Sequence, residues 1–261
     1  GFVDRTAPVL RVQNEKGTLR AVLFGAACHC TTLGPRNTLL CGDFAGFAQA
    51  ALQEIFPGTQ AMFITGCAGD ANPFPRDTMD YAEEHGATLA EEVARVLGSD
   101  LDPVHGPLKT TFARVDLPLQ KFTNEAELDK LPEKERSWRR YFIEAAKERL
   151  KQDGALPQTY NAPFAVWQFG DGLTLVGFSG ETLAGYVTMT TQALGPRNLW
   201  IAGYCNDVHG YLPTACVLAE GGYETRGLYT DIGLFAPEAE AVVMETIKKL
   251  ARQAGRDLPN P

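Results

Sequence analysis

The 261-residue sequence lacks the patterns that mark several large classes of protein. It has no run of roughly 18 apolar residues, so it predicts no transmembrane segment. It has no excess of positive charge, because 24 Lys and Arg residues stand against 32 Asp and Glu residues, giving a net charge of -8. Proteins that bind nucleic acids usually gather Lys and Arg into a basic stripe. We therefore expect no nucleic-acid partner.

Cysteine is also scarce, with six residues and none of the paired CxxC spacing that marks a structural zinc site. Most of the six lie among apolar or small residues, so we expect buried free thiols. Cys28 and Cys30 flank His29 at the end of an apolar segment. If that segment is a strand as far as His29, the two thiols face one side and the imidazole faces the other. One strand then cannot direct all three side chains at one metal ion.

The rest of the sequence alternates between strand and helix patterns. Short apolar, β-branched runs predict strands, and amphipathic runs bounded by capping residues, Gly or Pro predict helices. A hairpin is expected at Asp171-Gly172. The expected strands cover residues 8–12, 19–28, 61–66, 111–119, 162–170, 173–180 and 199–204, and the expected helices cover 43–55, 81–97, 125–152 and 237–253. This alternation indicates the α/β class, with a mixed β-sheet core flanked by helices in a single large domain.

The charged segment 125–152 is predicted to form one solvated helix, because Glu and Lys or Arg recur at helical neighbour spacings. It carries three aromatic residues, Trp138, Tyr141 and Phe142. They can line a lipid-facing groove, or they can pack onto the core, which apolar positions on one helix face favour.

Four segments far apart in the chain carry unusual groupings of Gly, Asn, Tyr and metal-binding residue types. They are AACHCTTLG (26–34), ITGCAGDANP (64–73), GFSGET (177–182) and GYCNDVHGYLPTACVLAEGGYE (203–224). Together they resemble the active-site framework of the neutral ceramidases, a family of zinc-dependent amide hydrolases. The resemblance covers most of residues 8–250. It implies a ceramidase-like catalytic domain over residues 1–261 that lacks its N-terminal part, because the family takes one zinc-ligating histidine from upstream of the first segment.

His29 ends an apolar run and is followed by Thr31, Thr32 and then Gly42-Asp43. The same succession accompanies a zinc-ligating histidine in the neutral ceramidases, so the resemblance implies that His29 is a ligand. Without it, an isolated histidine is more often structural, as we expect for His85 and His105. Asp43 is expected to cap the helix that starts there, and it can also orient a ligating imidazole.

Glu181 follows a buried-strand pattern, where a carboxylate is costly unless it is paired, caps a helix or binds a metal. The residues alone allow Ser179 and Glu181 to start a helix over 183–194, since acidic residues favour a helix N-terminus. The resemblance to the family's glycine-glutamate metal motif implies instead that Glu181 is a zinc ligand.

The fourth segment contains two tyrosines twelve residues apart, Tyr211 and Tyr223. In the neutral ceramidases a zinc-binding tyrosine precedes a Leu/Ile-x-Thr step, and a substrate-contacting tyrosine follows after the same interval. The resemblance thus implies that Tyr211 is a ligand and Tyr223 a substrate contact. The alternative for either is a half-buried ring whose hydroxyl is bonded locally. His209 is a candidate substitute ligand, or a surface or hydrogen-bonded histidine.

The second segment departs from the family at Asn72, where the family has an essential serine. Asparagine can donate an N–H group to a developing oxyanion or position an amide, but it offers no hydroxyl nucleophile. We expect Asp70, Asn72 and Tyr223 to position substrate or stabilise the oxyanion. The change leaves the substrate open among amides, esters and lactones.

The resemblance thus implies a hydrolase in which zinc is held by His29, Glu181 and Tyr211. Water activated by the metal would cleave an amide (N-acyl, ceramide-like) or related ester bond; manganese or iron also suits these ligands. A small or lipid-like amide is the implied substrate, and a secreted or periplasmic location fits the family. The alternative is a metal-poor fragment, a binding or structural module that needs a separate N-terminal segment for activity. The partner of this chain can be such an N-terminal segment or further copies of the chain in a homo-oligomer.

Overall fold

The computed structural model describes residues 1–229 and 231–259, without the side chains of residues 134, 135 and 138. The chain divides into two compact units, Gly1–Pro103 and Val104–Pro261, and each is described by itself. Both combine a β-sheet with helices, so the predicted α/β class with mixed sheets flanked by helices is confirmed. That the two units act as one catalytic domain stays a prediction.

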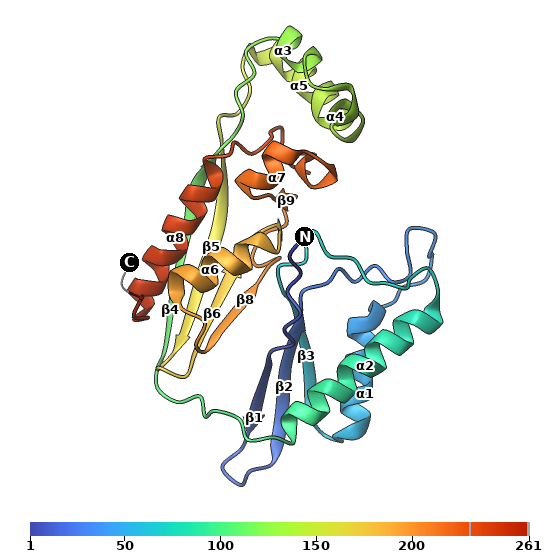
Figure 1. Cartoon of the computed structure of the whole chain (residues 1–261), viewed down its shortest axis with the longest axis vertical. Coiled ribbons are helices and arrows are strands. Elements are labelled where there is room, and N and C mark those ends of the chain that lie inside the picture. The colour runs from blue at the N-terminus through green and yellow to red at the C-terminus, as the bar shows by residue number, and fades with distance from the viewer. Residues whose placement is uncertain (230, 260–261) are drawn as a thin grey trace. The chain divides into compact units, whose positions relative to one another are not determined.

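The first unit is a three-stranded sheet with two helices (Figure 1). β1 (Val9–Gln13) pairs antiparallel with β2 (Leu19–Ala26), which pairs parallel with β3 (Gln60–Thr65). α1 (Asp43–Ile55) joins β2 to β3, and α2 (Met79–Leu97) follows β3 and packs on α1. Since β2 and β3 run in parallel, the loops that follow them begin at the same edge of the sheet.

Apolar side chains from the strands and from the facing sides of both helices form the core of this unit. They include Val22, Phe24, Ala48, Leu52, Ala61, Ala90, Val93 and Leu97. The close approach of the two helices depends on Gly86, because a Cβ atom there would lie 2.5 Å from Phe47 Cβ and 2.8 Å from Phe44 O. A larger residue at position 86 would push α1 and α2 apart.

The second unit contains a four-stranded sheet in the order β4-β5-β6-β8. β4 (Leu108–Pro118), β5 (Thr159–Phe169) and β6 (Leu173–Phe178) pair antiparallel, and β8 (Leu199–Ala202) pairs parallel with β6. The hairpin predicted at Asp171-Gly172 connects β5 to β6 and is confirmed. The parallel pair again brings two loops to one edge of a sheet.

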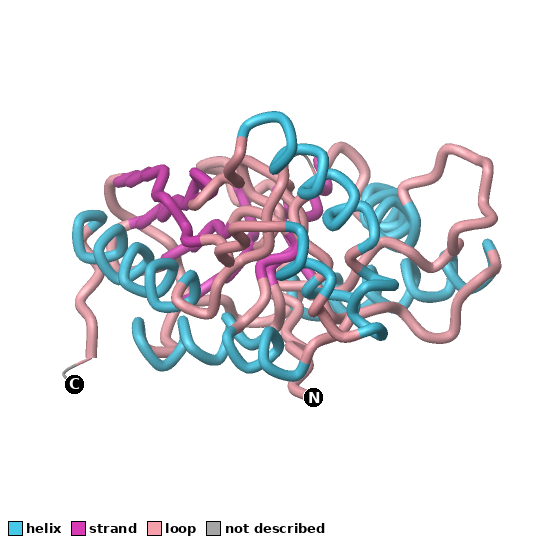
Figure 2. Tube along the Cα trace, turned by 90° about the horizontal axis from the view of Figure 1, so that it is seen from above, coloured by secondary structure: helices cyan, strands magenta, loops and turns pink. Residues whose placement is uncertain are grey.

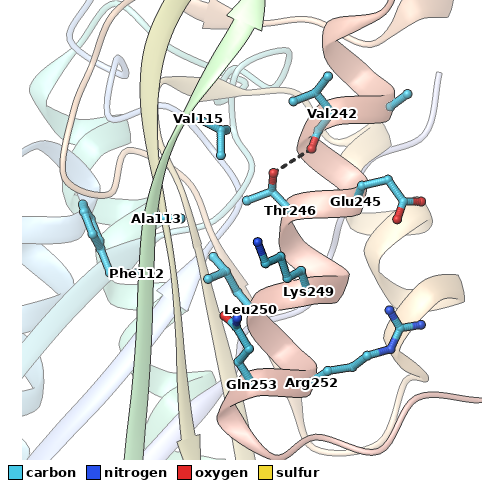
Figure 3. Close-up of a pocket in the computed structure, with 11 residues that line it drawn as sticks. Phe112, Ala113, Val115, Val242, Glu245, Thr246, Lys249, Leu250, Arg252 and Gln253 are labelled. Atoms are coloured by element: carbon cyan, nitrogen blue, oxygen red, sulfur yellow. Dashed lines mark hydrogen bonds between the residues drawn. The ribbon is translucent and has the colours of Figure 1, made fainter.

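Two helices, α6 (Gly185–Leu194) and α8 (Ala239–Ala254), cover this sheet. α6 contacts β8, α8 contacts β4 and β5, and the helices contact each other, so they share one face of the sheet (Figures 1 and 2). A groove of about 690 Å³ lies between α8 and β4. Figure 3 shows the residues that line it, among them Phe112, Val115 and Leu250. None of the predicted site residues lines this groove.

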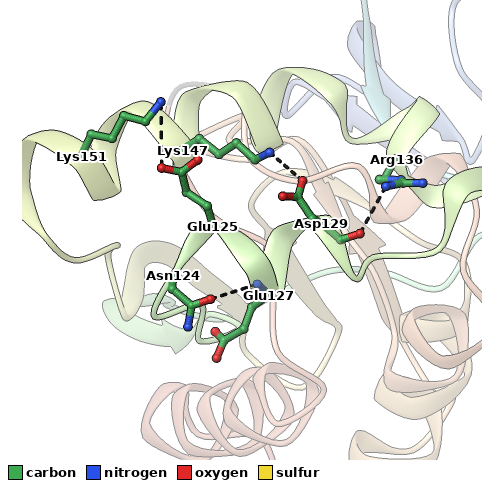
Figure 4. Close-up of polar contacts among 7 residues, drawn as sticks. All are labelled: Asn124, Glu125, Glu127, Asp129, Arg136, Lys147 and Lys151. Carbon is green, nitrogen blue, oxygen red and sulfur yellow. Dashed lines mark hydrogen bonds and ion pairs between the residues drawn. The ribbon is translucent and has the colours of Figure 1, made fainter.

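Segment 125–152 forms three helices rather than the single helix that we predicted. They are α3 (Glu125–Asp129), α4 (Glu133–Trp138) and α5 (Arg140–Asp153). Pro132 accounts for the first break, because proline lacks an N–H group and disfavours helical conformation in the residue before it. The helices nevertheless stay together. Lys147 Nζ lies 2.6 Å from Asp129 Oδ1 and so links α5 to α3; this ion pair is drawn in Figure 4.

The aromatic residues of this segment do not share one environment. Phe142 is buried against Phe122, Leu128 and Leu234, so the packing interpretation is confirmed for this residue. Tyr141 is exposed. The side chain of Trp138, part of the same prediction, lies outside the described residues.

All six cysteines are free thiols, as predicted, but only Cys67 is buried. Cys30, Cys41 and Cys216 are exposed, so the expectation of burial is wrong for these three. β2 ends at Ala26, before Cys28, so the predicted strand alternation around His29 does not apply. Among the described residues, no helix is both long and apolar enough to cross a membrane.

Candidate functional site

In the first unit, the loop after β2 lies beside the loop after β3. The His29 N–H donates to Ala71 O at 2.9 Å, and His29 Nε2 lies 3.3 Å from Gly69 O. When Nε2 carries the proton and donates it to this carbonyl, the lone pair is on Nδ1. This is the state in which a histidine can bind a metal.

Asp70 and Asn72 lie in the same pair of loops, and both side chains are exposed. Asn72 Oδ1 accepts a hydrogen bond from Thr31 Oγ1 at 3.1 Å. The NH₂ group of the same amide can donate two hydrogen bonds to other partners. The unit therefore brings together the predicted residues His29, Asp70 and Asn72.

The prediction that Asp43 is the N-cap residue of α1 is wrong, although its side chain accepts from an amide in the first turn of the helix. Gly42 occupies the N-cap position, and Asp43 is buried with a φ of 53°. Asp43 Oδ1 accepts from the Phe44 N–H at 2.8 Å and Oδ2 from the Leu33 N–H at 3.1 Å. Neither partner is an imidazole, and the orienting role of Asp43 stays a prediction. Asp43 ties the preceding loop to the start of α1.

In the metal-free protein, the two thiols beside His29 do not ionise at neutral pH. Loss of water around the sulfur atoms raises the pKa of Cys28 and of Cys30 to about 11, although other parts of Cys30 are exposed, and the Asp43 carboxylate adds to the effect in both. Both thiols are therefore protonated at pH 7. A metal ion that binds either thiol has to displace its proton, whereas His29 can bind as a neutral imidazole.

In the second unit, Glu181 and Tyr211 are direct strand partners. β7 (Glu181–Thr182) pairs parallel with β9 (Tyr211–Leu212) in the register Glu181↔Tyr211, and the Glu181 N–H donates to Gly210 O at 2.8 Å. Because Glu181 lies in a strand and α6 begins only at Gly185, the helix-start interpretation of Ser179 and Glu181 is wrong.

Tyr211 and Tyr229 lie next to the Glu181 carboxylate, and Tyr223 packs against Tyr211. The Tyr229 hydroxyl donates to Glu181 Oε1 at 2.5 Å. The Tyr211 ring centroid lies 5.7 Å from that of Tyr223 and 6.2 Å from that of Tyr229, with both neighbours nearly edge-on. Tyr211 is 9% exposed, whereas Tyr223 and Tyr229 are 42% and 41% exposed. The cluster thus has a buried phenol at its base and two accessible rings at its rim.

The surroundings keep the inner phenols neutral. Burial raises the pKa of Tyr211, and the nearby Glu181 charge raises it further. Burial also raises the pKa of Tyr229, as does the hydrogen bond to Glu181. A divalent cation between Glu181 and Tyr211 would oppose these shifts, because an opposite charge favours the ionised phenol. A carboxylate and a phenol as direct neighbours therefore fit a hard divalent cation.

The complete ligand set stays a prediction. Among the described residues, no group of three or more His, Cys, Asp and Glu side chains could hold a metal ion. The predicted zinc ligands are His29, Glu181 and Tyr211. They are not a group of this kind, because a tyrosine is one of the three. They also come from both units, His29 from the first and Glu181 from the second.

Arg226 and Tyr229 belong to the cluster, although sequence analysis did not select them. The guanidinium carbon of Arg226 lies 4.9 Å from the Tyr223 ring centroid and 4.7 Å from that of Tyr229, and Arg226 Nη1 donates to the Tyr223 hydroxyl. One signal was present in the sequence. Tyr223, Arg226 and Tyr229 recur every three residues, and the first lies in a 3₁₀ turn, η1 (Tyr223–Thr225).

The turn that carries Tyr223 is anchored by a buried arginine. Arg139 lies between α4 and α5 and is 4% exposed. Its Nε donates to Thr225 O at 3.1 Å, and its Nη2 donates to Thr225 Oγ1 at 2.9 Å. The charged helical segment is thus part of the support of the candidate site.

His209 lies beneath the strand that carries Glu181. It is fully buried, with Nε2 3.3 Å from Ser179 Oγ and the ring against Tyr160 and Phe235. Burial lowers its pKa to about 4, with Asp207 acting in the opposite direction. The hydrogen-bonded interpretation is confirmed and the surface interpretation is wrong.

His85 has a structural contact, as expected, because its Nε2 lies 2.7 Å from Pro75 O.

Comparison with known proteins gives a likeness in fold alone. No protein-family model and no curated protein matches this chain. The neutral ceramidase from Pseudomonas aeruginosa is similar, with a TM-score of 0.72 and 20% identity, covering 99% of this chain and 48% of that chain. A ceramidase complexed with C2 has a TM-score of 0.70 and 16% identity, covering 99% and 49%. The chain therefore has the fold of about half of a neutral ceramidase, which confirms the expected resemblance at the level of the fold.

Proposed function

We propose that this protein is a zinc-dependent hydrolase that cleaves an amide bond, or a related ester bond, in a lipid-like substrate. One observation carries the proposal. Glu181 and Tyr211, expected to be ligands from segments thirty residues apart, are register partners, and the Tyr223 ring lies against Tyr211. The likeness in fold to a neutral ceramidase supports it.

In this proposal His29, Glu181 and Tyr211 hold Zn²⁺. When bound, zinc supplies Lewis acidity for a substrate carbonyl and for water. The role of Tyr229 is to hold Oε1 of Glu181, which fixes the direction of the carboxylate. His209 supports the adjacent backbone, because a Cβ atom on Gly180 would lie 2.5 Å from His209 Cε1.

Asn72, Asp70 and Tyr223 act on the substrate in this proposal. The Asn72 NH₂ group can donate to an oxyanion, since its carbonyl oxygen already accepts from Thr31. Tyr223 lies at the accessible rim of the cluster, where a substrate chain can reach it. Because Asn72 has no hydroxyl, the proposal extends to amides, esters and lactones and is not limited to ceramide.

The test combines metal analysis with a substrate panel. The purified protein would be assayed for zinc by elemental analysis and for hydrolysis of N-acyl amides, esters and lactones, with and without a chelator. We expect stoichiometric zinc, and turnover that falls by more than about 100-fold on chelation and in Glu181→Ala. Glu245→Ala, an exposed glutamate on α8, is the matched control.

Two outcomes would contradict the proposal in different ways. If neither chelation nor Glu181→Ala changes the turnover, the metal assignment is wrong. A protein without zinc and without turnover on the whole panel would support the alternative of a binding or structural module that needs a separate segment. The same preparation, analysed by light scattering, tests for a homo-oligomer.

A further inference from the structure

Arg226 is presented at the accessible rim of the candidate site by two aromatic rings. Its guanidinium lies over the faces of Tyr223 and Tyr229, at 4.9 and 4.7 Å from the ring centroids. Both rings keep about two fifths of their surface exposed, at 42% and 41%. The stack thus holds the cation in one orientation while leaving the rim open to a ligand.

The hydrogen-bonding edge of this guanidinium is largely unused by the protein. Among the described residues, the side chain of Arg226 forms no ion pair, and its hydrogen bond is the one from Nη1 to the Tyr223 hydroxyl. The nearby carboxylate, Glu181, instead accepts from Tyr229. Ring faces attract the cation but accept nothing from the in-plane N–H groups. Several donors in a planar fork therefore point away from protein acceptors.

A planar fork of N–H donors matches a carboxylate, sulfonate or phosphate, which it can bind through two parallel hydrogen bonds. Stacking between rings limits the rotation of the arginine side chain, so less freedom is lost when an anion binds. A neutral hydroxyl cannot use this fork in the same way. The chemistry of the stack therefore favours substrates that carry an anionic group.

We infer that the stack of Tyr223, Arg226 and Tyr229 binds an anionic group of the substrate, and that the substrate class is an anionic amide. This inference rests on the proposed function and deepens it, because it places the charged group of the substrate beside Glu181 and Tyr211. It assigns Arg226 a role in specificity. If Arg226 only held the two tyrosine rings in place, its substitution would weaken the binding of neutral and anionic ligands equally.

The experiment measures binding and turnover separately. Binding of 1-octanesulfonate and of 1-octanol, which share a chain length and have no cleavable bond, would be compared by calorimetry. Turnover of N-dodecanoylglycine and of N-dodecanoylethanolamine would be compared as kcat/KM. We expect wild type to prefer the anionic member of each pair by about tenfold or more. Arg226→Met and Arg226→Gln should bring both ratios close to one.

The controls separate charge from geometry. Arg226→Lys keeps the charge without the planar fork and should give intermediate ratios. Lys249→Met removes an exposed cation on α8 that lines the groove against β4 and belongs to no contact of the stack, and it should leave both ratios unchanged. Equal ratios for wild type and Arg226→Gln, or no anion preference in wild type, would overturn the inference. A retained binding preference without any hydrolysis would overturn the proposed function and leave the anion site standing.

Discussion

The two units place their predicted site residues at equivalent positions but hold them by different interactions. In each unit the residues follow a pair of parallel strands, β2 and β3 in the first and β6 and β8 in the second. In the first unit a backbone hydrogen bond from His29 to Ala71 joins the loops, and Asn72 is exposed. In the second unit the backbone pairing of β7 with β9 is joined by contacts between side chains, as from Tyr229 to Glu181.

This difference predicts where a substitution should most reduce the stability or the activity of the protein. Backbone hydrogen bonds survive most changes of side chain, so the loops of the first unit should tolerate conservative replacement. The phenol and carboxylate of the second unit are partly or largely buried, where electrostatic interactions are stronger than in water. Shifted pKa values of Tyr211 and Tyr229 mark the same place, as is common for functional groups.

The largest effect should come from Tyr211→Phe. This change removes a proposed zinc ligand while keeping the ring that packs against Tyr223 and Tyr229. We expect turnover and zinc affinity to fall by at least about 100-fold, as measured by substrate assay and metal titration. Tyr141→Phe, at an exposed position on α5, is the control. Wild-type zinc binding in the Tyr211 variant would show that the second unit does not supply the metal site.

Arg139→Met should destabilise the second unit. Methionine keeps much of the buried side-chain volume but leaves Thr225 O and Thr225 Oγ1 without their charged donor. The expected loss in the free energy of unfolding is about 2 to 3 kcal/mol, measured by urea denaturation. The neighbouring Arg140→Met, at an exposed position, should change it by no more than about 0.5 kcal/mol. Equal effects of the two would contradict the anchoring role of Arg139.

Ionisation of Cys205 should lower the free energy of unfolding at alkaline pH. Burial raises the pKa of this thiol from 9.0 to about 11 in the folded protein. Between these pH values the thiol is ionised in the unfolded chain and protonated in the folded chain. Ionisation therefore lowers the free energy of the unfolded state relative to the folded state. Stability should therefore fall as pH rises from 9 towards 11, by an amount of about 2 kcal/mol attributable to this thiol.

The measurement is the pH dependence of urea denaturation in Cys205→Ala and in Cys41→Ala, whose thiol is exposed. Only the first change should flatten the curve above pH 9. Identical curves for the two variants would show that Cys205 does not carry the effect.

The smallest effect should come from Thr31→Val in the first unit. It removes a hydrogen bond to Asn72 between exposed side chains, and we expect a change within about 0.5 kcal/mol in the free energy of unfolding. Tyr229→Phe removes a hydrogen bond to a carboxylate in the second unit and should cost about 1.5 kcal/mol or more. A larger loss for Thr31→Val than for Tyr229→Phe, in urea denaturation, would reverse the comparison between the units.

Much of the secondary structure could be predicted from the sequence, because hydrophobic period, caps and turn residues act within short segments. The hairpin at Asp171-Gly172 and the helix that ends before Pro57 are examples. The break at Pro132 was also readable, but the charge pattern across 125–152 outweighed it in the prediction. Asp43 was misread because its partner Leu33 belongs to a preceding loop that has no regular pattern.

The candidate site was only partly accessible to sequence reasoning. Resemblance selected Glu181 and Tyr211, and their strand pairing agrees with a shared role. Tyr229 and Arg226 were missed, because nothing in the four family-like segments marks them. Both lie beyond the last of those segments, and their importance becomes visible only through contacts with Glu181 and Tyr223.

By itself the sequence determined the α/β class, most strands and helices, and the residue types available for metal and amide chemistry, since these depend on local periodicity and side-chain chemistry. Only the tertiary structure decided that Tyr229 reaches Glu181 across a separation of 48 residues, and that Arg139 holds Thr225 across 86. The physical reason is that such contacts depend on how distant segments pack. The pairing of β7 with β9 and the bridge between Gly210 and Leu228 set that packing, and no short stretch of sequence encodes it.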